Sequence, residues 1–192
     1  MGGADPKSDR SSATFLHVAV WNADNQDPGF NLVQNGFVSK FRSRNFLDDA
    51  IWTLQAAGYR IVRLDAGSWA DEAAMHQSLS TALHFPDYYG RNLNALVDCL
   101  GDVAELDYGW AENETGLVIV IDNFDHFHSA IPNLAVTVLD IVSGAALRGA
   151  LLGNRILCLI RSDDPWLEPG PIGGYSPEWN PREWLTADRL DQ

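Results

Sequence analysis

The run "GLVIVIDNF" at residues 116–124 is the clearest strand in this 192-residue chain. An unbroken apolar run rich in β-branched residues is typical of a strand that is covered on both faces, as in a parallel sheet. Two shorter runs flank it, the strand-like "YRIVRLD" at 59–65 and "RILCLIR" at 155–161, which predicts a further buried strand. Because parallel strands need long crossover connections, we expect an α/β fold with a small parallel sheet of about three core strands and flanking helices.

Helical patterns fill the connections between these strands. Apolar residues recur at the three- and four-residue spacing of one helix face, and glycines stand where helices would end. Ser68 is a candidate N-cap. The expected helices are 46–57, about 68–83, a short one after Gly90, and about 129–152, with Pro132 or Gly144 as the place where the last could break.

The composition divides the chain into three parts. We expect an N-terminal extension at 1–44 with a disordered start, an α/β domain at 45–162 and a C-terminal extension at 163–192. The last part is rich in Pro and Gly and also contains Trp, so it should pack on the core as an irregular segment. We expect its tryptophans to be packed rather than to stack on nucleic-acid bases. They are Trp166, Trp179 and Trp184.

The N-terminal extension contains two candidate extra strands. "ATFLHVAVW" at 13–21 alternates as a strand does. "FNLVQNGFVSKF" at 30–41 could pair with it, with Asn35-Gly36 as a turn.

Negative charge is concentrated in the middle of the chain. The net charge is −13, and between Leu64 and Leu147 there are thirteen acidic residues and one basic residue, Arg91, for a net charge of −12. Such a field attracts a basic protein and repels nucleic acid and anionic membrane surfaces. We therefore expect a basic protein partner, no nucleic acid and no membrane. The alternative is an acidic surface that only keeps the protein soluble.

Cysteine usage and the absence of targeting signals suggest a compartment. Cys99 and Cys158 lie far apart, with no CxxC pair, which favours two buried thiols in a reducing environment. The first residues lack the apolar core of a signal peptide, and no apolar run reaches the length of a membrane span. We expect a soluble cytoplasmic protein, with a monomer favoured.

The segment "PDYYGRNLNALVDC" at 86–99 holds the candidate functional residues. Its helix places Asn94 and Asp98, four residues apart, on one outward face. We place Asp98 toward the C-terminal end of that helix, where the helix dipole disfavours a carboxylate and an ion-pairing partner would suit it. The apolar positions expected to face the core are Leu93, Leu96, Val97 and Leu100.

This segment resembles the barstar family, intracellular protein inhibitors of barnase-type ribonucleases. The family hallmark is Pro-acid-Tyr-Tyr-Gly-x-Asn-Leu-x-Ala-Leu-x-Asp-Cys-Leu, which residues 86–100 match without a gap. By order of elements the resemblance extends from about Tyr59 to Arg161. It implies a barstar-like three-layer fold and a protein that blocks the active site of a basic ribonuclease, with no catalysis, cofactor or metal of its own.

The resemblance also assigns roles to residues. In the family, the loop and helix enter the basic active site of the ribonuclease, and the helix aspartate that corresponds to Asp98 mimics the substrate phosphate. The implied partner-binding residues are Tyr88, Gly90, Asn92, Asn94, Asp98 and Asp102.

The chain departs from the family pattern at five positions. Asn94 and Arg91 stand where acidic residues are expected, and Val97 and Val103 stand where aromatic residues are expected. A further acidic contact near the end of the long helix has Arg148 as its nearest counterpart. These changes affect the choice of partner more than the fold.

Two other functions stay open. The first is a regulatory binding module that keeps the fold but binds a protein other than a nuclease. The second is a metal or catalytic site in "DNFDHFHS", after a predicted strand, formed by Asp122, Asp125, His126 and His128. Histidines two apart in a loop point in different directions, so a solvated turn is the simpler interpretation.

Overall fold

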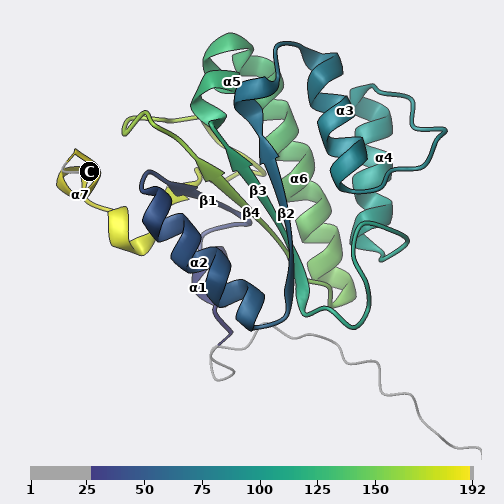
Figure 1. The fold of residues 1–192 in the computed structure, drawn as a ribbon, viewed down its shortest axis with the longest axis horizontal. Helices are drawn as coiled ribbons and strands as arrows, with labels where there is room; N and C mark the ends of the chain where they lie inside the picture. Colours follow the sequence, from purple (N-terminus) through teal and green to yellow (C-terminus); the bar gives the residue numbers. More distant parts are fainter. Residues whose placement is uncertain (1–26, 191–192) are drawn as a thin grey trace, which may run out of the picture.

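The computed structural model of the protein describes residues 27–190, which are built around a sheet of five strands (Figure 1). The strands are β1 (Val38–Phe41), β2 (Tyr59–Asp65), β3 (Gly116–Asp122), β4 (Ile156–Arg161) and β5 (Glu178–Trp179). Their order in space is β2-β3-β4-β1-β5, and every neighbouring pair is parallel. The three expected core strands are confirmed as β2, β3 and β4, and β1 and β5 extend the sheet beyond β4.

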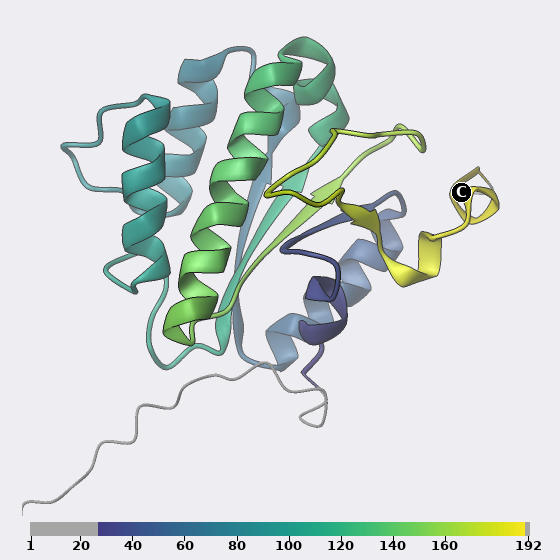
Figure 2. The ribbon, with the colours of Figure 1, turned by 180° about the vertical axis from the view of Figure 1, so that it is seen from behind.

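Helices cover both faces of this sheet. They are α1 (Phe30–Val33), α2 (Arg44–Ala56), α3 (Glu72–Ala82), α4 (Leu93–Ala104), α5 (Phe124–Ala130) and α6 (Pro132–Leu152), while the short α7 (Thr186–Leu190) lies to one side of the sheet (Figure 1). Helices α3 to α6 lie on one face, and α1 and α2 lie on the other (Figures 1 and 2). The predicted three-layer α/β fold is therefore present.

Alternate residues of the central strands divide the core into two clusters. Ile119 and Ile121 of β3 belong to the larger cluster beneath α3 to α6, whereas Val118 and Val120 belong to the smaller cluster beneath α2. All seven residues of β3 are buried. A strand covered on both faces gains from apolar residues at every position, which explains the continuous apolar run in the sequence.

The segment 30–41 does not form the predicted strand of a hairpin. Its first part is helix α1, and its last part is β1, which lies parallel to both of its neighbours. Gly36 has φ +129°, and a Cβ on it would lie 1.8 Å from the ring of Tyr175. The Tyr175 hydroxyl accepts hydrogen bonds from the backbone N–H groups of Phe37 (2.7 Å) and Val38 (3.2 Å). A tyrosine far along the chain thus determines this conformation. The other predicted strand, 13–21, lies outside the described residues.

Two helix boundaries differ from the predicted ones. Asp71, and not Ser68, caps α3, because its carboxylate accepts a hydrogen bond from the Ala74 N–H at 2.8 Å. The long apolar helix breaks just before Pro132, as one of the two alternatives predicted, and Gly144 lies inside α6. Proline fits the first turn of α6 since the missing N–H would have no helical partner there.

The C-terminal segment packs against β1 through a buried lysine. The Lys40 ammonium group is almost fully buried and donates to the Leu167 carbonyl (3.0 Å) and to Glu168 (2.8 Å). It also lies 4.9 Å from the centre of the Trp179 ring. Burial lowers the pKa of Lys40, and the Glu168 carboxylate opposes that shift. The contacts join residues 163–190 to the sheet, while the boundaries 1–44, 45–162 and 163–192 stay predictions.

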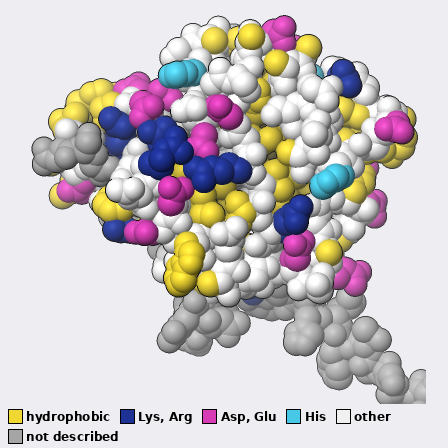
Figure 3. Space-filling view, viewed as in Figure 1, with side chains coloured by type: hydrophobic (Ala, Val, Ile, Leu, Met, Phe, Trp, Pro, Cys, Tyr) yellow, Lys and Arg dark blue, Asp and Glu magenta, His cyan; other side chains and the backbone are white. Residues whose placement is uncertain are grey.

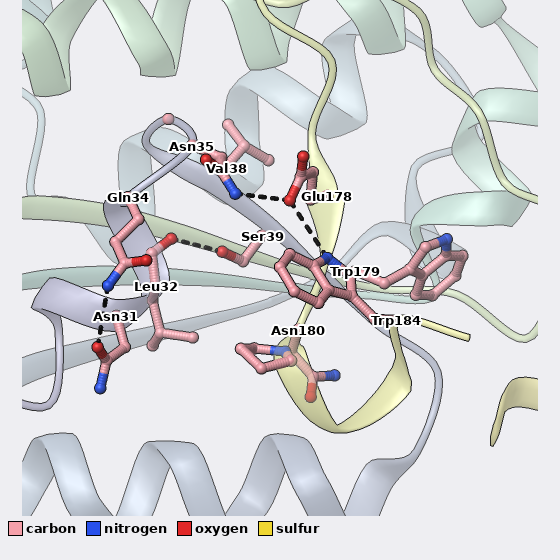
Figure 4. Close-up of a pocket in the computed structure, with 12 residues that line it drawn as sticks. Asn31, Leu32, Gln34, Asn35, Val38, Ser39, Glu178, Trp179, Asn180 and Trp184 are labelled. Atoms are coloured by element: carbon pink, nitrogen blue, oxygen red, sulfur yellow. Dashed lines mark hydrogen bonds between the residues drawn. The ribbon is translucent and has the colours of Figure 1, made fainter. Parts of the chain in front are cut away.

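Glu178 of β5 makes a second junction between the two ends of the chain (Figure 4). Its carboxylate accepts hydrogen bonds from Asn35 (2.6 Å) and from the Trp184 indole (3.2 Å) beside a cavity of about 50 Å³. The predicted packing of the tryptophans is right for one of three. Trp179 is buried, whereas Trp166 and Trp184 are 60% and 57% exposed, because they lie in loops outside the sheet.

Helix α6 is the only helix among residues 27–190 with the length and composition of a membrane span. Half of its apolar window is buried inside the protein, with Ala135, Val138 and Leu139 fully buried in the larger core cluster. Core helices of globular domains meet the same criteria of length and hydropathy.

Candidate functional site

The loop between α3 and α4 turns one tyrosine outward and its neighbour inward. Tyr88 is 80% exposed, whereas Tyr89 is buried. The Tyr89 N–H donates to the Pro86 carbonyl at 2.9 Å, which closes a tight turn around the two residues between them. Arg91 then takes a left-handed backbone conformation with φ +48°. These features direct the Tyr88 ring into solvent.

Tyr89 fixes the loop to the core. Its hydroxyl forms a short hydrogen bond with Nδ1 of the buried His76, whose Nε2 lies 3.3 Å from a Glu72 carboxylate oxygen. The Phe85 ring packs edge-on against Tyr89, with 4.9 Å between the ring centres. Burial raises the pKa of Tyr89, so the phenol keeps its proton at neutral pH. His76 could not be found from the sequence, because its spacing is that of an ordinary core residue of α3.

Asn92 begins helix α4. Its side-chain oxygen accepts a hydrogen bond from the Ala95 N–H at 3.0 Å, and its amide group lies 3.3 Å from the Gly90 carbonyl. A Cβ on Gly90 would lie 3.1 Å from that amide nitrogen, so glycine allows the close turn. Both predicted contact residues therefore shape the junction between the loop and the helix.

Asp98 lies in the middle of α4, with its side chain exposed. Within residues 27–190 its carboxylate makes no hydrogen bond or ion pair. Asn94 is exposed one turn before it. The predicted position near the C-terminal end was wrong, because α4 continues to Ala104. In the middle of the helix the dipole does not disfavour Asp98, and its exposed carboxylate without a partner among the described residues is what suits it to an ion pair.

Asp102 continues the line of Asn94 and Asp98 along α4 but is partly buried. Its carboxylate accepts a hydrogen bond from the Tyr108 hydroxyl at 3.1 Å, and the same hydroxyl lies 3.1 Å from the Cys99 carbonyl. Burial raises the pKa of Tyr108. Asp102 therefore has an internal partner, which makes it a weaker candidate for partner binding than Asp98.

Val97 lies outside the core, which corrects the prediction that it faces inward. Its side chain is 51% exposed beside a groove of about 360 Å³ between α4 and α6. Leu96, Leu100 and Val103 are fully buried instead, because the core-facing side of α4 is centred on them.

Arg148 of α6 lies beside the C-terminal half of α4. Its guanidinium group forms an ion pair with Glu105, and a Cβ on Gly101 would lie 3.0 Å from it. The glycine thus leaves room for the arginine to cross over α4. The pair with Glu105 offsets the positive charge that Arg148 brings to this edge of the acidic region.

Residues 59–160 match the family model described as Barstar (barnase inhibitor). The chain belongs to the barstar family. The matched barstar region runs from β2 to β4 and includes the loop and helix described above, while β1, α2 and β5 lie outside it.

A curated relative supports the same assignment. The chain is 34% identical over 86 residues to "Putative ribonuclease inhibitor YrdF" of Bacillus subtilis (strain 168). The alignment covers 45% of this chain and 85% of that protein. The barstar family assignment and the fold are thereby confirmed, and the partner-binding residues stay a prediction.

The structure separates the departures from the barstar pattern by exposure. Asn94 and Val97 are exposed on α4 and are available to a partner. Val103, which stands where an aromatic residue is expected, is fully buried and therefore cannot contact a partner. Arg91 is exposed and has a positive charge at the start of the barstar-like helix.

The segment "DNFDHFHS" does not gather metal ligands. Asp122 is buried and accepts a hydrogen bond from Arg63 at 2.6 Å. His126 and His128 lie on helix α5, and not in the loop that the sequence predicted, since Asn123 starts the helix directly after β3. Within residues 27–190 no group of three or more His, Cys, Asp or Glu side chains could hold a metal ion.

Proposed function

We propose that this chain inhibits a basic ribonuclease by covering its active site with the loop 86–92 and the exposed side of α4. The observation that carries the proposal is Asp98, an exposed carboxylate in the middle of α4 with no partner among the described residues. A carboxylate held on a rigid helix can replace a substrate phosphate among arginine and lysine side chains. The name of the Bacillus relative, "Putative ribonuclease inhibitor YrdF", supports the same function.

The charge of the chain supports binding to a basic enzyme. The loop and α4 lie within the stretch from Leu64 to Leu147, which has a net charge of −12. Complementary fields of this kind accelerate association and weaken as salt screens them. A ribonuclease binds a polyanion and therefore presents the positive charge that Asp98 requires.

The rigid loop supports tight binding. The Tyr89–His76 contact and the Asn92 cap hold Tyr88 and Asp98 in place before a partner arrives. Groups that are already ordered lose less conformational entropy on binding, so more of the contact energy appears as affinity. Inhibition of this kind is steric and electrostatic and needs no catalytic residue, cofactor or metal. A monomer in the cytoplasm would suffice.

The test is capture from native lysate at low salt, using wild type, Asp98→Asn and Glu112→Gln. Asp98→Asn keeps the shape of the side chain and removes one charge, whereas Glu112 is an exposed acid in the turn before β3 and serves as the matched control. We expect wild type and Glu112→Gln to retain a basic ribonuclease and inhibit it. Asp98→Asn should weaken inhibition at least 10-fold, because truncating a central charged contact costs on the order of 2 kcal/mol or more.

A second function is favoured by the exposed, uncharged Asn94 and Val97. They suit a regulatory binding module whose partner is less basic than a ribonuclease. The same experiment separates the two functions. If a non-nuclease protein is retained equally by wild type and Asp98→Asn, ribonuclease inhibition is refuted and the regulatory module is supported.

A further inference from the structure

A pocket of about 430 Å³ opens where β1 continues into α2. This volume lies within the range of about 300–1,000 Å³ that is typical of small-molecule sites. Three arginines and no acidic residue are among its lining residues, which are Arg42, Ser43, Arg44, Asn45, Phe46 and Arg161. Lys and Arg side chains gather at the start of α2 on this face, at the left of the space-filling view (Figure 3).

Arg161 is a buried cation in the wall of this pocket. The residue is 7% exposed, and its Nε atom has no hydrogen-bond partner. Its other nitrogens contact Asp163 at 2.5 Å and Asn123 at 3.4 Å. The buried Nε of Arg42 also lacks a partner. Buried donors are normally satisfied, so two arginine donors without an acceptor among residues 27–190 are an unusual feature of this cluster.

The start of α2 adds positive potential. The Ser43 side chain makes no capping hydrogen bond, and the first turn of α2 contains no acidic residue. Among residues 27–190 the exposed Arg44 makes a single long ion pair, with Asp122 at 3.6 Å. The Glu183 carboxylate already accepts hydrogen bonds from the backbone N–H groups of Arg42 (3.0 Å) and Ser43 (2.6 Å). The N–H groups of the first turn of this 13-residue helix remain for a second anion, which the helix dipole favours.

The position of the pocket in the sheet also indicates ligand binding. After β1 the chain continues into α2 on one face, whereas after β4 it continues to Leu167 and Ile172 on the opposite face. The neighbouring strands β4 and β1 therefore form a switch point. In open parallel sheets, ligands bind outside the carboxyl ends of the strands at such points.

Asp163 shows how an anion is held at this place. Its carboxylate bridges Arg42 (3.1 Å) and Arg161 (2.5 Å), and its side chain is 51% exposed in the loop after β4. An incoming anion would compete with this carboxylate or displace it toward solvent. A phosphate group is the better match for several arginines, since it accepts bidentate hydrogen bonds and has up to two negative charges.

We propose that this pocket binds the phosphate group of a small molecule, with Arg42, Arg44 and Arg161 as its ligands. An extended polyanion is disfavoured because the rest of the molecule is strongly acidic. The proposal is independent of ribonuclease inhibition, because the pocket lies at the α2 side of the sheet and the loop and α4 lie on the other face (Figure 1).

The test is isothermal titration calorimetry of the full chain with three probes: inorganic phosphate, adenosine 5′-monophosphate and adenosine. We expect saturable binding of the first two and none of adenosine. Tighter binding of the monophosphate than of phosphate would identify a phosphorylated metabolite as the ligand, whereas equal binding would identify free phosphate. Adenosine binding as tightly as its monophosphate, or no saturable binding of either phosphate probe, would overturn the proposal.

Variants locate the site. Arg44→Ala should weaken phosphate binding at least 10-fold without unfolding the protein, since the side chain is half exposed. Asp163→Asn should tighten binding several-fold by removing the internal competitor. Arg60→Ala removes an exposed arginine from β2 and should leave affinity unchanged. If Arg44→Ala and Arg60→Ala lower the phosphate affinity equally, the loss comes from the net charge of the protein, and this pocket is refuted as the site.

Discussion

Tyr88 and Tyr89 are adjacent, yet their rings have opposite environments. Tyr88 is exposed, whereas Tyr89 is buried against His76 and Phe85. Tyr89→Phe keeps the ring and removes the hydroxyl, so Nδ1 of His76 loses its buried partner. We expect the free energy of unfolding to fall by about 1–3 kcal/mol, measured by urea denaturation.

Tyr88→Phe is the matched control at the same scale. Its hydroxyl is in solvent, so the free energy of unfolding should change by less than about 0.5 kcal/mol. If the two variants lose equal stability, the Tyr89–His76 contact does not anchor the loop.

Helix α4 offers a second matched pair of residues. Asn92 caps the helix, whereas Asn94 is exposed within it. Asn92→Ala should lower the free energy of unfolding by about 1 kcal/mol, because the Ala95 N–H loses its acceptor. Asn94→Ala should leave stability unchanged or raise it by less than about 0.7 kcal/mol, because alanine is the better helix former. Thermal and urea denaturation of both variants measure the difference, and a larger loss from Asn94→Ala would contradict it.

The elements that the sequence predicted well are those whose pattern is local. The runs at 59–65, 116–124 and 155–161 became β2, β3 and β4 with ends shifted by two residues at most. Strands β3 and β4 are buried on both faces and are apolar along most of their length, whereas β2 alternates between buried and exposed residues. The prediction for the segment 30–41 was wrong because the conformation of this segment depends on Tyr175, 138 residues beyond Phe37. No local pattern contains that contact.

Within the candidate site, the order of residues was predictable and their surroundings were not. Asn94 and Asp98 share the exposed side of α4 as their spacing indicates. Val97 fits the apolar spacing equally well but lies at the edge of the buried side, where the groove beside α6 exposes it. Asp102 is partly covered because Tyr108 folds back onto α4 after the helix ends.

The whole molecule should lose stability at alkaline pH. Burial raises the pKa of the Cys158 thiol to about 12 and raises the pKa of Cys99 and of four tyrosines, which are Tyr59, Tyr89, Tyr108 and Tyr175. In the unfolded chain these groups lose their protons at lower pH than in the folded protein. Their contribution to stability is therefore complete below about pH 8.5 and is lost as the pH rises through the folded values.

One buried base opposes this trend. The lowered pKa of Lys40 makes the folded state bind fewer protons than the unfolded state just below pH 10.5, so Lys40 alone favours folding as the pH rises. The two cysteines and four tyrosines act in the opposite direction and outnumber this single lysine. We expect the free energy of unfolding, measured by urea denaturation at pH 7.5, 9 and 10.5, to fall at each step. A constant free energy of unfolding across that range would show that the thiols and phenols ionise as easily in the folded protein as in the unfolded chain.

The position of β1 between β4 and β5 has a consequence for biosynthesis. Residues 38–41 leave the ribosome early, but both of the strands that hydrogen-bond to them are translated more than a hundred residues later. Among the described strands, the nascent β1 therefore has no ladder partner until residue 161 has emerged, and its second partner is complete only at residue 179. During translation, β2, β3 and the helices around Asp98 can assemble first, and the half of the sheet that holds α2 closes last.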